Sequence, residues 1–340
     1  ERCVESKAVE MSELLVVRDL ETQFKVRAGR LHAVNGVSFS LKQGEMLGVV
    51  GESGCGKSVT MMSLIRLLPP SASITNGSVM LEGLDLIKAN KQQINAVRGS
   101  KIGMIFQDPM TSLNPFVKIG IQLSEGLIYH KRMGKREAYD RCAQYLDLVG
   151  ISNSRHRLEE YPHQLSGGMR QRVMIAMALV CEPKIVIADE PTTALDVTIQ
   201  AQIVELVKEL REKLNASIIW ITHDLSLLAG MADRIMVMYA GCIVEEACLR
   251  DLYKDPRHPY TIGLLDSIPR IKNDENLRLK SIPGQPPNLM QKPSSCPFAS
   301  RCAFKTERCE RENPSLAFAP GEIEGSSHKI ACWVDTRGRQ

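Results

Sequence analysis

The chain lacks a long apolar run, and it lacks an excess of charge of either sign. No stretch of its 340 residues approaches the roughly 18 apolar residues that a membrane-spanning helix needs. The 43 basic and 39 acidic residues leave a net charge of +4, which is too balanced to favour nucleic-acid binding. No signal peptide is evident. We therefore expect a protein that works in the cytosol and does not cross a bilayer by itself.

The ten cysteines include no Cys-x-x-Cys pair, so the spacing of an ordinary zinc ribbon is missing. In a chain of this length they also argue against a small secreted scaffold held by disulfides. We expect reduced thiols or metal ligands instead. Four cysteines should be ordinary small residues of the core or surface: Cys142, Cys181, Cys242 and Cys248.

A glycine-rich segment from Gly51 to Ser58 has the sequence Gly-Glu-Ser-Gly-Cys-Gly-Lys-Ser. It follows an apolar run over residues 46–50 and precedes apolar residues at helical spacing, which predicts a loop between a buried strand and a helix. In such a loop backbone N–H groups face an anion, Lys57 reaches terminal phosphates and the Ser58 hydroxyl binds Mg²⁺. A glycine turn with an incidental lysine is the alternative, and the strand and helix context favours the phosphate site.

Upstream, residues 14–17 and 33–41 are typical of two antiparallel strands joined by a polar loop. Phe24 ends the first of them. An exposed aromatic ring at this point can stack on an adenine, whereas an aromatic near a strand end is also common in a core. Both interpretations of Phe24 are open.

Polar side chains follow three predicted strands where each strand ends. Gln107 follows residues 102–106, Asp189 and Glu190 end the strand over 184–190, and His223 follows residues 217–222. Ligands of open α/β sheets bind at the carboxyl ends of the strands, so these residues form a candidate site. Asp189 can hold Mg²⁺ through its water shell. Glu190 can orient and deprotonate a water that attacks phosphorus.

Helical rather than strand spacing over residues 119–157 predicts a helical insertion. It is followed by Ser166, Gly167 and Gly168 at the start of an apolar helix over 173–180. Ser166 is a good N-cap, and the glycines leave first-turn N–H groups uncovered, which indicates a second anion site.

After Gly241 the alternation of strands and helices stops, and frequent prolines mark a loop-rich unit. It contains Cys296, Cys302, Cys309 and Cys332. Because the segment is poor in apolar residues it needs another source of order, and four clustered thiols in a reducing compartment suggest a metal. The spacing does not separate zinc from iron-sulfur, and unrelated surface thiols are the alternative.

From about Leu14 to Tyr239 the chain resembles an ABC transporter ATP-binding subunit. The motifs that carry the resemblance are the Walker A loop at 51–58, the Q-loop Gln107, the signature motif at 165–169, Walker B at 185–189 with the catalytic Glu190, the D-loop at 194–196 and the switch His223. In that family two subunits stack head to tail, and each ATP lies between the Walker A loop of one and the signature helix of the other.

The resemblance implies a role for each matched residue. Catalysis falls to Glu190, His223 and Gln107, and Mg²⁺ to Ser58, Gln107 and Asp189. The ATP site comprises Phe24, Gly51, Ser53, Gly54, Cys55, Gly56, Lys57, Ser58, Val59, Gln107 and Asp189, together with Ser166 and Gly168 acting on the partner's nucleotide.

Within this family, residues 161–172, 257–261 and 264–265 resemble the D-type ATPases of dipeptide and oligopeptide permeases. That resemblance implies a [4Fe-4S] cluster on Cys296, Cys302, Cys309 and Cys332. It also implies a paralogous ATPase partner in a heterodimer, two transmembrane permease subunits and an extracytoplasmic peptide-binding protein, with no nucleic acid. The ATPase would sit peripherally on the cytoplasmic face of the cell membrane.

The expected fold is α/β: a P-loop ABC ATPase core with a mixed sheet, an antiparallel β-subdomain and a helical subdomain, plus a small C-terminal cysteine-rich domain. Residues 1–10 would be a leader or an expression remnant before a native start at Met11. The ATPase domain would span 11–245, with the helical subdomain at about 115–180, and the last domain 246–340. A nickel or other small-solute importer ATPase, a soluble ABC ATPase outside transport, and a redox-sensing role for the cysteine tail are the alternatives.

Overall fold

The computed structural model describes residues 13–193, 195–268, 281–322 and 328–337. The chain divides into two compact units. The first unit comprises residues 1–41, 46–87 and 222–340, and the second comprises residues 42–45 and 88–221. The predictions for residues 1–10, Met11 and Ala194 of the D-loop fall outside the described residues. The predicted domain bounds stay predictions.

One sheet of the first unit contains four strands. Their order is β2 (Gly29–Lys42), β1 (Glu13–Val26), β4 (Ala72–Leu81) and β5 (Leu84–Asp85). β1 and β4 run antiparallel, with Leu15 opposite Leu81, and both of these side chains are buried. The strands predicted over 14–17 and 33–41 are confirmed and extend further than expected.

The other strands of this unit include β3, which directly precedes the glycine-rich loop. β3 (Met46–Val50) lies parallel to β9 (Arg234–Tyr239), which pairs antiparallel with β10 (Cys242–Cys248). β12 (Lys329–Ile330) pairs with β10, and β11 (Ala317–Phe318) pairs with β12. All five residues of β3 are buried, which explains its uninterrupted apolar sequence. The helical elements are α1 (Lys57–Leu64), α9 (Leu225–Leu228), α10 (Leu249–Lys254), α11 (Pro259–Asp266), η2 (Ala299–Arg301) and α12 (Glu307–Arg311).

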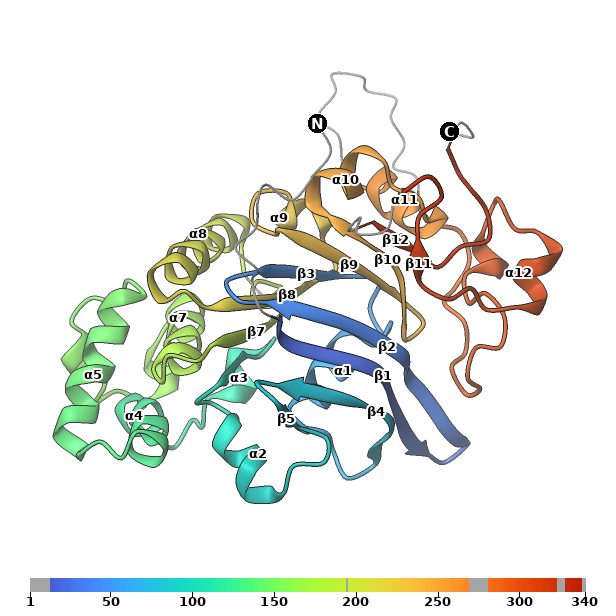
Figure 1. Cartoon of the computed structure of the whole chain (residues 1–340). Coiled ribbons are helices and arrows are strands. Elements are labelled where there is room, and N and C mark those ends of the chain that lie inside the picture. Colours follow the sequence, from blue (N-terminus) through green and yellow to red (C-terminus); the bar gives the residue numbers. More distant parts are fainter. Residues whose placement is uncertain (1–12, 194, 269–280, 323–327, 338–340) are drawn as a thin grey trace, which may run out of the picture. The chain divides into compact units, whose positions relative to one another are not determined.

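The second unit contains three parallel strands in the order β8 (Ser217–Thr222), β7 (Ile185–Asp189) and β6 (Ile102–Ile105). Its helical elements are α2 (Lys91–Val97), α3 (Pro109–Ser112), α4 (Ile119–His130), α5 (Lys135–Leu148), α6 (Ser154–Arg157), η1 (Pro162–Gln164), α7 (Gly167–Leu179) and α8 (Val197–Leu214). The helices predicted within 119–157 are confirmed, and α4 packs on α5 and both pack on α7 (Figure 1). Across the described ranges, each helix falls short of the length or apolarity that a membrane crossing requires.

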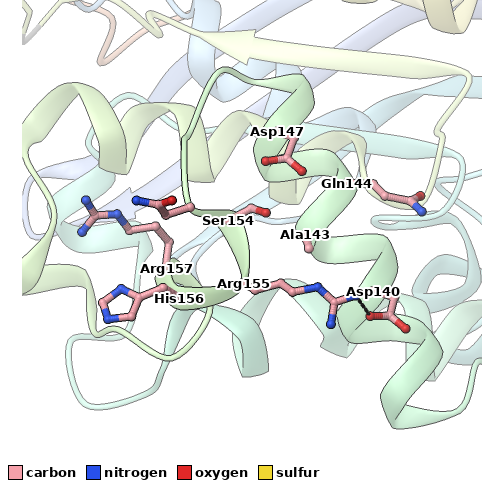
Figure 2. A pocket seen from close by; sticks show the side chains of 9 residues that line it. Asp140, Ala143, Gln144, Asp147, Ser154, Arg155, His156 and Arg157 are labelled. Atoms are coloured by element: carbon pink, nitrogen blue, oxygen red, sulfur yellow. Dashed lines mark hydrogen bonds and ion pairs between the residues drawn. The ribbon is translucent and has the colours of Figure 1, made fainter.

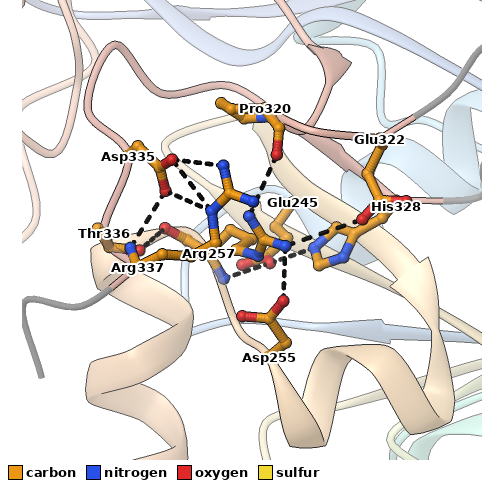
Figure 3. A network of polar contacts seen from close by, with 9 residues as sticks. All are labelled: Glu245, Asp255, Arg257, Pro320, Glu322, His328, Asp335, Thr336 and Arg337. Carbon is orange, nitrogen blue, oxygen red and sulfur yellow. Dashed lines mark hydrogen bonds and ion pairs between the residues drawn. The ribbon is translucent and has the colours of Figure 1, made fainter.

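A buried carboxylate organises the end of the first unit. Glu245 on β10 is fully buried, and its oxygens accept hydrogen bonds from the backbone N–H groups of Arg257 (2.7 Å) and His258 (2.9 Å). His328 Nε2 lies 2.8 Å from Glu245 Oε1, and the Thr336 hydroxyl donates to the Arg257 carbonyl (Figure 3). A buried carboxylate is tolerated only when it is paired and hydrogen-bonded, so this cluster fixes two distant segments on β10.

His258 also caps helix α11. Its Nδ1 accepts a hydrogen bond from the backbone N–H of Tyr260 at 3.1 Å, which requires that this nitrogen carry no proton. The side chain is buried, and burial lowers the pKa of His258 to about 4, although Glu245 acts in the opposite direction. The neutral imidazole is therefore the form that the fold selects.

The free energy of unfolding should fall as the pH drops from about 6.5 to about 4. In this window the unfolded chain protonates His258 and the folded chain does not. The free energy of unfolding should therefore be about 3 kcal/mol lower at pH 4 than above pH 6.5. Urea unfolding of the wild type and of His258→Asn, which keeps an N-cap acceptor, measures this at several pH values. The variant should show a smaller loss, and equal losses would contradict the assignment.

Candidate functional site

The loop between β3 and α1 depends on glycine. Gly54 and Gly56 have φ angles of 78° and 103°, in the region that side chains disfavour. A Cβ at Gly51 would lie 2.2 Å from the Met238 carbonyl oxygen, and one at Gly56 would lie 2.4 Å from that of Ala33. No other residue fits at these two positions, so the backbone of the loop is fixed by its packing.

Lys57 opens helix α1 and is buried. Its ammonium group donates to the carbonyl oxygens of Gly51 (2.7 Å) and Glu52 (3.1 Å). Ser53 and Gly54 at the tip are exposed, Cys55 and Gly56 are buried, and Ser58 and Val59 are half-buried. Burial raises the pKa of the Cys55 thiol. A glycine cradle, an ammonium and a hydroxyl at a helix N-terminus fit a polyphosphate with its Mg²⁺.

In the second unit, the paired acids follow a buried strand as predicted. Asp189 is the last residue of β7 and is buried, with Ile221 of β8 as its strand neighbour. Glu190 follows with φ of 45°, in the left-handed region, and its backbone N–H donates to the Ile221 carbonyl at 3.1 Å. A non-glycine residue held in this conformation costs about 1–3 kcal/mol, and such positions concentrate at functional sites.

The structure brings Gln107 and Glu190 together. Gln107 lies two residues beyond β6, and its Nε2 donates to Glu190 Oε2 at 3.3 Å. Thr193 donates its hydroxyl to the same oxygen at 2.9 Å. Sequence reasoning missed Thr193 because a threonine after a strand end carries no signal of its own. The orientation of the Glu190 carboxylate is therefore set by two neighbours.

Ser166 is the N-cap of α7, as predicted. Its hydroxyl accepts a hydrogen bond from the Met169 backbone N–H at 3.3 Å. Ser166 and Gly167 are exposed and Gly168 is partly exposed, so this helix N-terminus faces solvent in the described part of the chain.

The remaining two predicted nucleotide residues belong to the first unit. Phe24 lies near the end of β1, opposite Ala72, and is half-buried. His223 is exposed and is the first residue after β8. Adenine stacking by Phe24 and a switch role for His223 stay predictions.

The predicted [4Fe-4S] cluster on Cys296, Cys302, Cys309 and Cys332 is wrong. All four are free thiols, and among the described residues no group of three or more His, Cys, Asp or Glu side chains could hold a metal ion. Burial, with a smaller contribution from neighbouring thiols, raises the pKa of Cys296 and of Cys332 to about 11. In the described structure these two buried thiols are therefore harder to ionise than an exposed cysteine.

Sequence reasoning also missed two contacts to the phosphate loop. The Glu52 carboxylate binds Arg301, and the Glu52 backbone N–H donates to the Tyr260 hydroxyl at 2.8 Å. Tyr260 lies in the 257–261 motif, which is a signal that could have led to it. Arg301 is 249 positions away from Glu52, and nothing local marks it.

A hollow of about 870 Å³ in the second unit lies beside α5 and α6. Figure 2 shows charged side chains of both signs around it, including Arg155, which donates to Asp140 at 2.7 Å. None of its lining residues belongs to a predicted site, so we assign it no ligand.

Comparison with known families agrees with these motifs. The family described as "ABC transporter" matches residues 34–193, and the family described as "Oligopeptide/dipeptide transporter, C-terminal region" matches residues 244–309. A dimeric ATP-binding cassette, MJ0796, bound to ADP and Pi superposes with a TM-score of 0.63 at 28% identity, covering 69% of this chain and 99% of that one. The fold and motifs define a P-loop ATPase of the ABC type.

Curated relatives narrow the class. The dipeptide transport ATP-binding protein DppD of Bacillus subtilis is 49% identical over 325 residues, covering 95% of both chains. The oligopeptide transport ATP-binding protein OppD of Salmonella typhimurium is 49% identical over 310 residues, covering 91% of this chain and 92% of that protein. The chain belongs to the D-type ATP-binding subunits of the dipeptide/oligopeptide permease family.

Replacing Lys57 by Ala should weaken MgATP binding by about 10–100-fold, because a hydrogen bond to a charged group contributes about 1.5–3 kcal/mol. Titration calorimetry measures this on the full chain. Lys305→Ala, which removes an exposed lysine paired with Glu310 in the same unit, is the control and should bind normally. Unchanged affinity in Lys57→Ala would contradict the phosphate-loop assignment.

Proposed function

We propose that this ATPase powers the uptake of dipeptides or oligopeptides through a membrane permease. The main support is the extent of the similarity. Relatives named as dipeptide and oligopeptide transport proteins match over nine-tenths of the chain, and the match includes the C-terminal region of that transporter family. A general ABC ATPase would account for residues 34–193 but not for residues 244–309.

For the first unit we propose nucleotide binding. The N–H groups of the loop from Gly51 to Ser58 bind the phosphates, Lys57 neutralises their terminal charge, and Val59 continues the helix behind them. Phe24 stacks on the adenine and His223 senses the terminal phosphate. The glycine cradle and the position of Lys57 at the start of α1 support these roles.

For the second unit we propose the hydrolytic groups. Glu190 accepts the proton of the attacking water, and Gln107 and Thr193 orient its carboxylate. In this unit Gln107 and Asp189 would hold Mg²⁺, whose charge, when bound, offsets that of the phosphate oxygens. Ser58 is the Mg²⁺ ligand that we propose for the first unit. Ser166 and Gly168 serve the nucleotide of a partner ATPase, which the exposed N-terminus of α7 supports.

We further propose the surrounding assembly. A paralogous ATPase forms a heterodimer with this chain, two transmembrane permease subunits receive the motion, and an extracytoplasmic peptide-binding protein delivers the substrate. The ATPase then sits on the cytoplasmic face of the membrane, with residues 246–340 as its C-terminal domain. The dimeric state of the superposable cassette supports the ATPase pair.

Glu190→Gln should retain MgATP binding and lose turnover by about 100 to 10,000-fold, because the amide can hydrogen-bond a water but cannot accept its proton. Steady-state phosphate release from the assembled transporter measures the loss. Glu205 is an exposed glutamate on α8 of the same unit, so Glu205→Gln is the matched control and should keep full turnover. A Glu190→Gln protein with near-normal turnover would overturn the catalytic assignment.

Coexpression with two permease subunits and a second ATPase should yield a complex whose ATP hydrolysis rises when peptide-loaded binding protein is added. The lone chain at low concentration should turn over more slowly. If nickel stimulated ATP hydrolysis and peptide did not, the peptide substrate proposed here would be wrong. Full activity of the isolated chain, without copurifying permease subunits, would favour a soluble ABC ATPase.

A further inference from the structure

The C-terminal segment holds the phosphate loop at one residue, Glu52. Arg301 Nη1 donates to Glu52 Oε2 at 2.7 Å and Nη2 donates to Oε1 at 2.9 Å, which makes a bidentate pair. The Tyr260 hydroxyl accepts from the Glu52 backbone N–H at 2.8 Å. All three residues belong to the first unit. Arg301 and Tyr260 of the C-terminal segment therefore bind both the side chain and the backbone of Glu52.

The guanidinium of Arg301 is rigidly placed. Its side chain is 4% exposed, and its remaining N–H groups bond to the carbonyls of Pro283 (Nε, 2.9 Å) and Ile282 (Nη2, 3.3 Å) and to the Tyr239 hydroxyl (Nη1, 3.3 Å). With the two bonds to Glu52, these contacts account for all five donors of an arginine. A lysine has neither the number nor the geometry of donors to replace it.

The same hydrogen-bond network includes Lys57 of the loop. The carbonyl of Glu52 accepts a hydrogen bond from Lys57 Nζ at 3.1 Å, so one residue connects the phosphate-binding ammonium with Arg301 and Tyr260. The Glu52 side chain is 28% exposed. Without Arg301 it would place an unpaired negative charge within a loop that has to receive a polyphosphate, and like charges repel most where water is partly excluded.

We propose that Arg301 is a positioning residue for nucleotide binding, which neutralises Glu52 and orients it away from the phosphates. The inference rests on the role proposed above for the phosphate loop. It makes the affinity for MgATP a property that the C-terminal segment sets, through Arg301 on the side chain and Tyr260 on the backbone of Glu52.

The test is the MgATP affinity of the full chain in a double-mutant series. Arg301→Ala should lower the affinity about tenfold or more, and Arg301→Lys should lower it less. Adding Glu52→Ala to Arg301→Ala should restore the affinity to within about threefold of the wild type, because the unpaired charge is gone. Arg311→Ala, which removes an exposed arginine paired with Glu307 in the same segment, should leave it unchanged.

Salt separates repulsion from a purely structural effect. The affinity ratio of wild type to Arg301→Ala should shrink between about 50 and 500 mM salt, because the charge on a partly exposed carboxylate is screened. In steady-state hydrolysis the KM should rise, with kcat at saturating MgATP nearly constant. A salt-independent ratio, or a double variant as weak as Arg301→Ala, would overturn the proposal.

Two further variants keep the test decisive. If Arg301→Ala does not fold, Arg301→Gln should bind weakly and the Arg301→Gln/Glu52→Gln pair normally, because two amides can bond without net charge. Lys57→Ala in the same series isolates the underlying assumption. Weak binding by Lys57→Ala with normal binding by Arg301→Ala refutes only this inference, whereas normal binding by both refutes the phosphate loop itself.

Discussion

The close approach of the phosphate loop to its neighbouring strands is the constraint on which the first unit depends. The backbone at Gly51 and Gly56 lies so near the Met238 and Ala33 carbonyls that a single methyl group has no room. The turn after β9 is tied to the same loop, because the Gly241 N–H donates to the Cys55 carbonyl and the Gly241 carbonyl accepts from the Asn35 N–H, each at 2.8 Å. The direction of α1, and with it the position of Lys57, follows from this packing.

The acids of the second unit depend on a different constraint. Asp189 lies opposite Ile221 on the neighbouring parallel strand, so that the backbone N–H of the next residue, Glu190, reaches the Ile221 carbonyl. This bond, together with those from Gln107 and Thr193 to the carboxylate, holds Glu190 in its left-handed conformation. The unfavourable backbone angle is maintained by neighbours that also orient the side chain, which joins the local strain to the chemistry proposed for it.

Local patterns in the sequence were sufficient to predict many of the helices, strands and candidate site residues. The strand before Gly51, the helices within 119–157 and the Ser166 cap follow from periodicity and capping chemistry, which act over a few residues. The polar strand ends required only the geometry of parallel sheets, which brings Gln107 to Glu190. Such signals work because the residues that determine each element lie inside it.

Long-range contacts were beyond the sequence. Glu245 and His328 are 83 positions apart, and no local pattern says that one buried acid will meet that histidine. The cysteines illustrate the same limit, because their number and spacing carried no information on burial. Burial raises the pKa of Cys296 and of Cys332 to about 11, and among the described residues no group of three or more His, Cys, Asp or Glu side chains could hold a metal ion.

The contacts of Tyr260 and Arg301 with Glu52 also limit how such subunits can be recombined. One family match ends at residue 193 and the other begins at residue 244. Taken alone, these limits would make the C-terminal segment a module that can be exchanged between paralogues. The two contacts cross that boundary and meet on one residue of the loop. A chimaera that inherits its tail from one parent and its loop from another must therefore keep the acid and its two partners from the same parent.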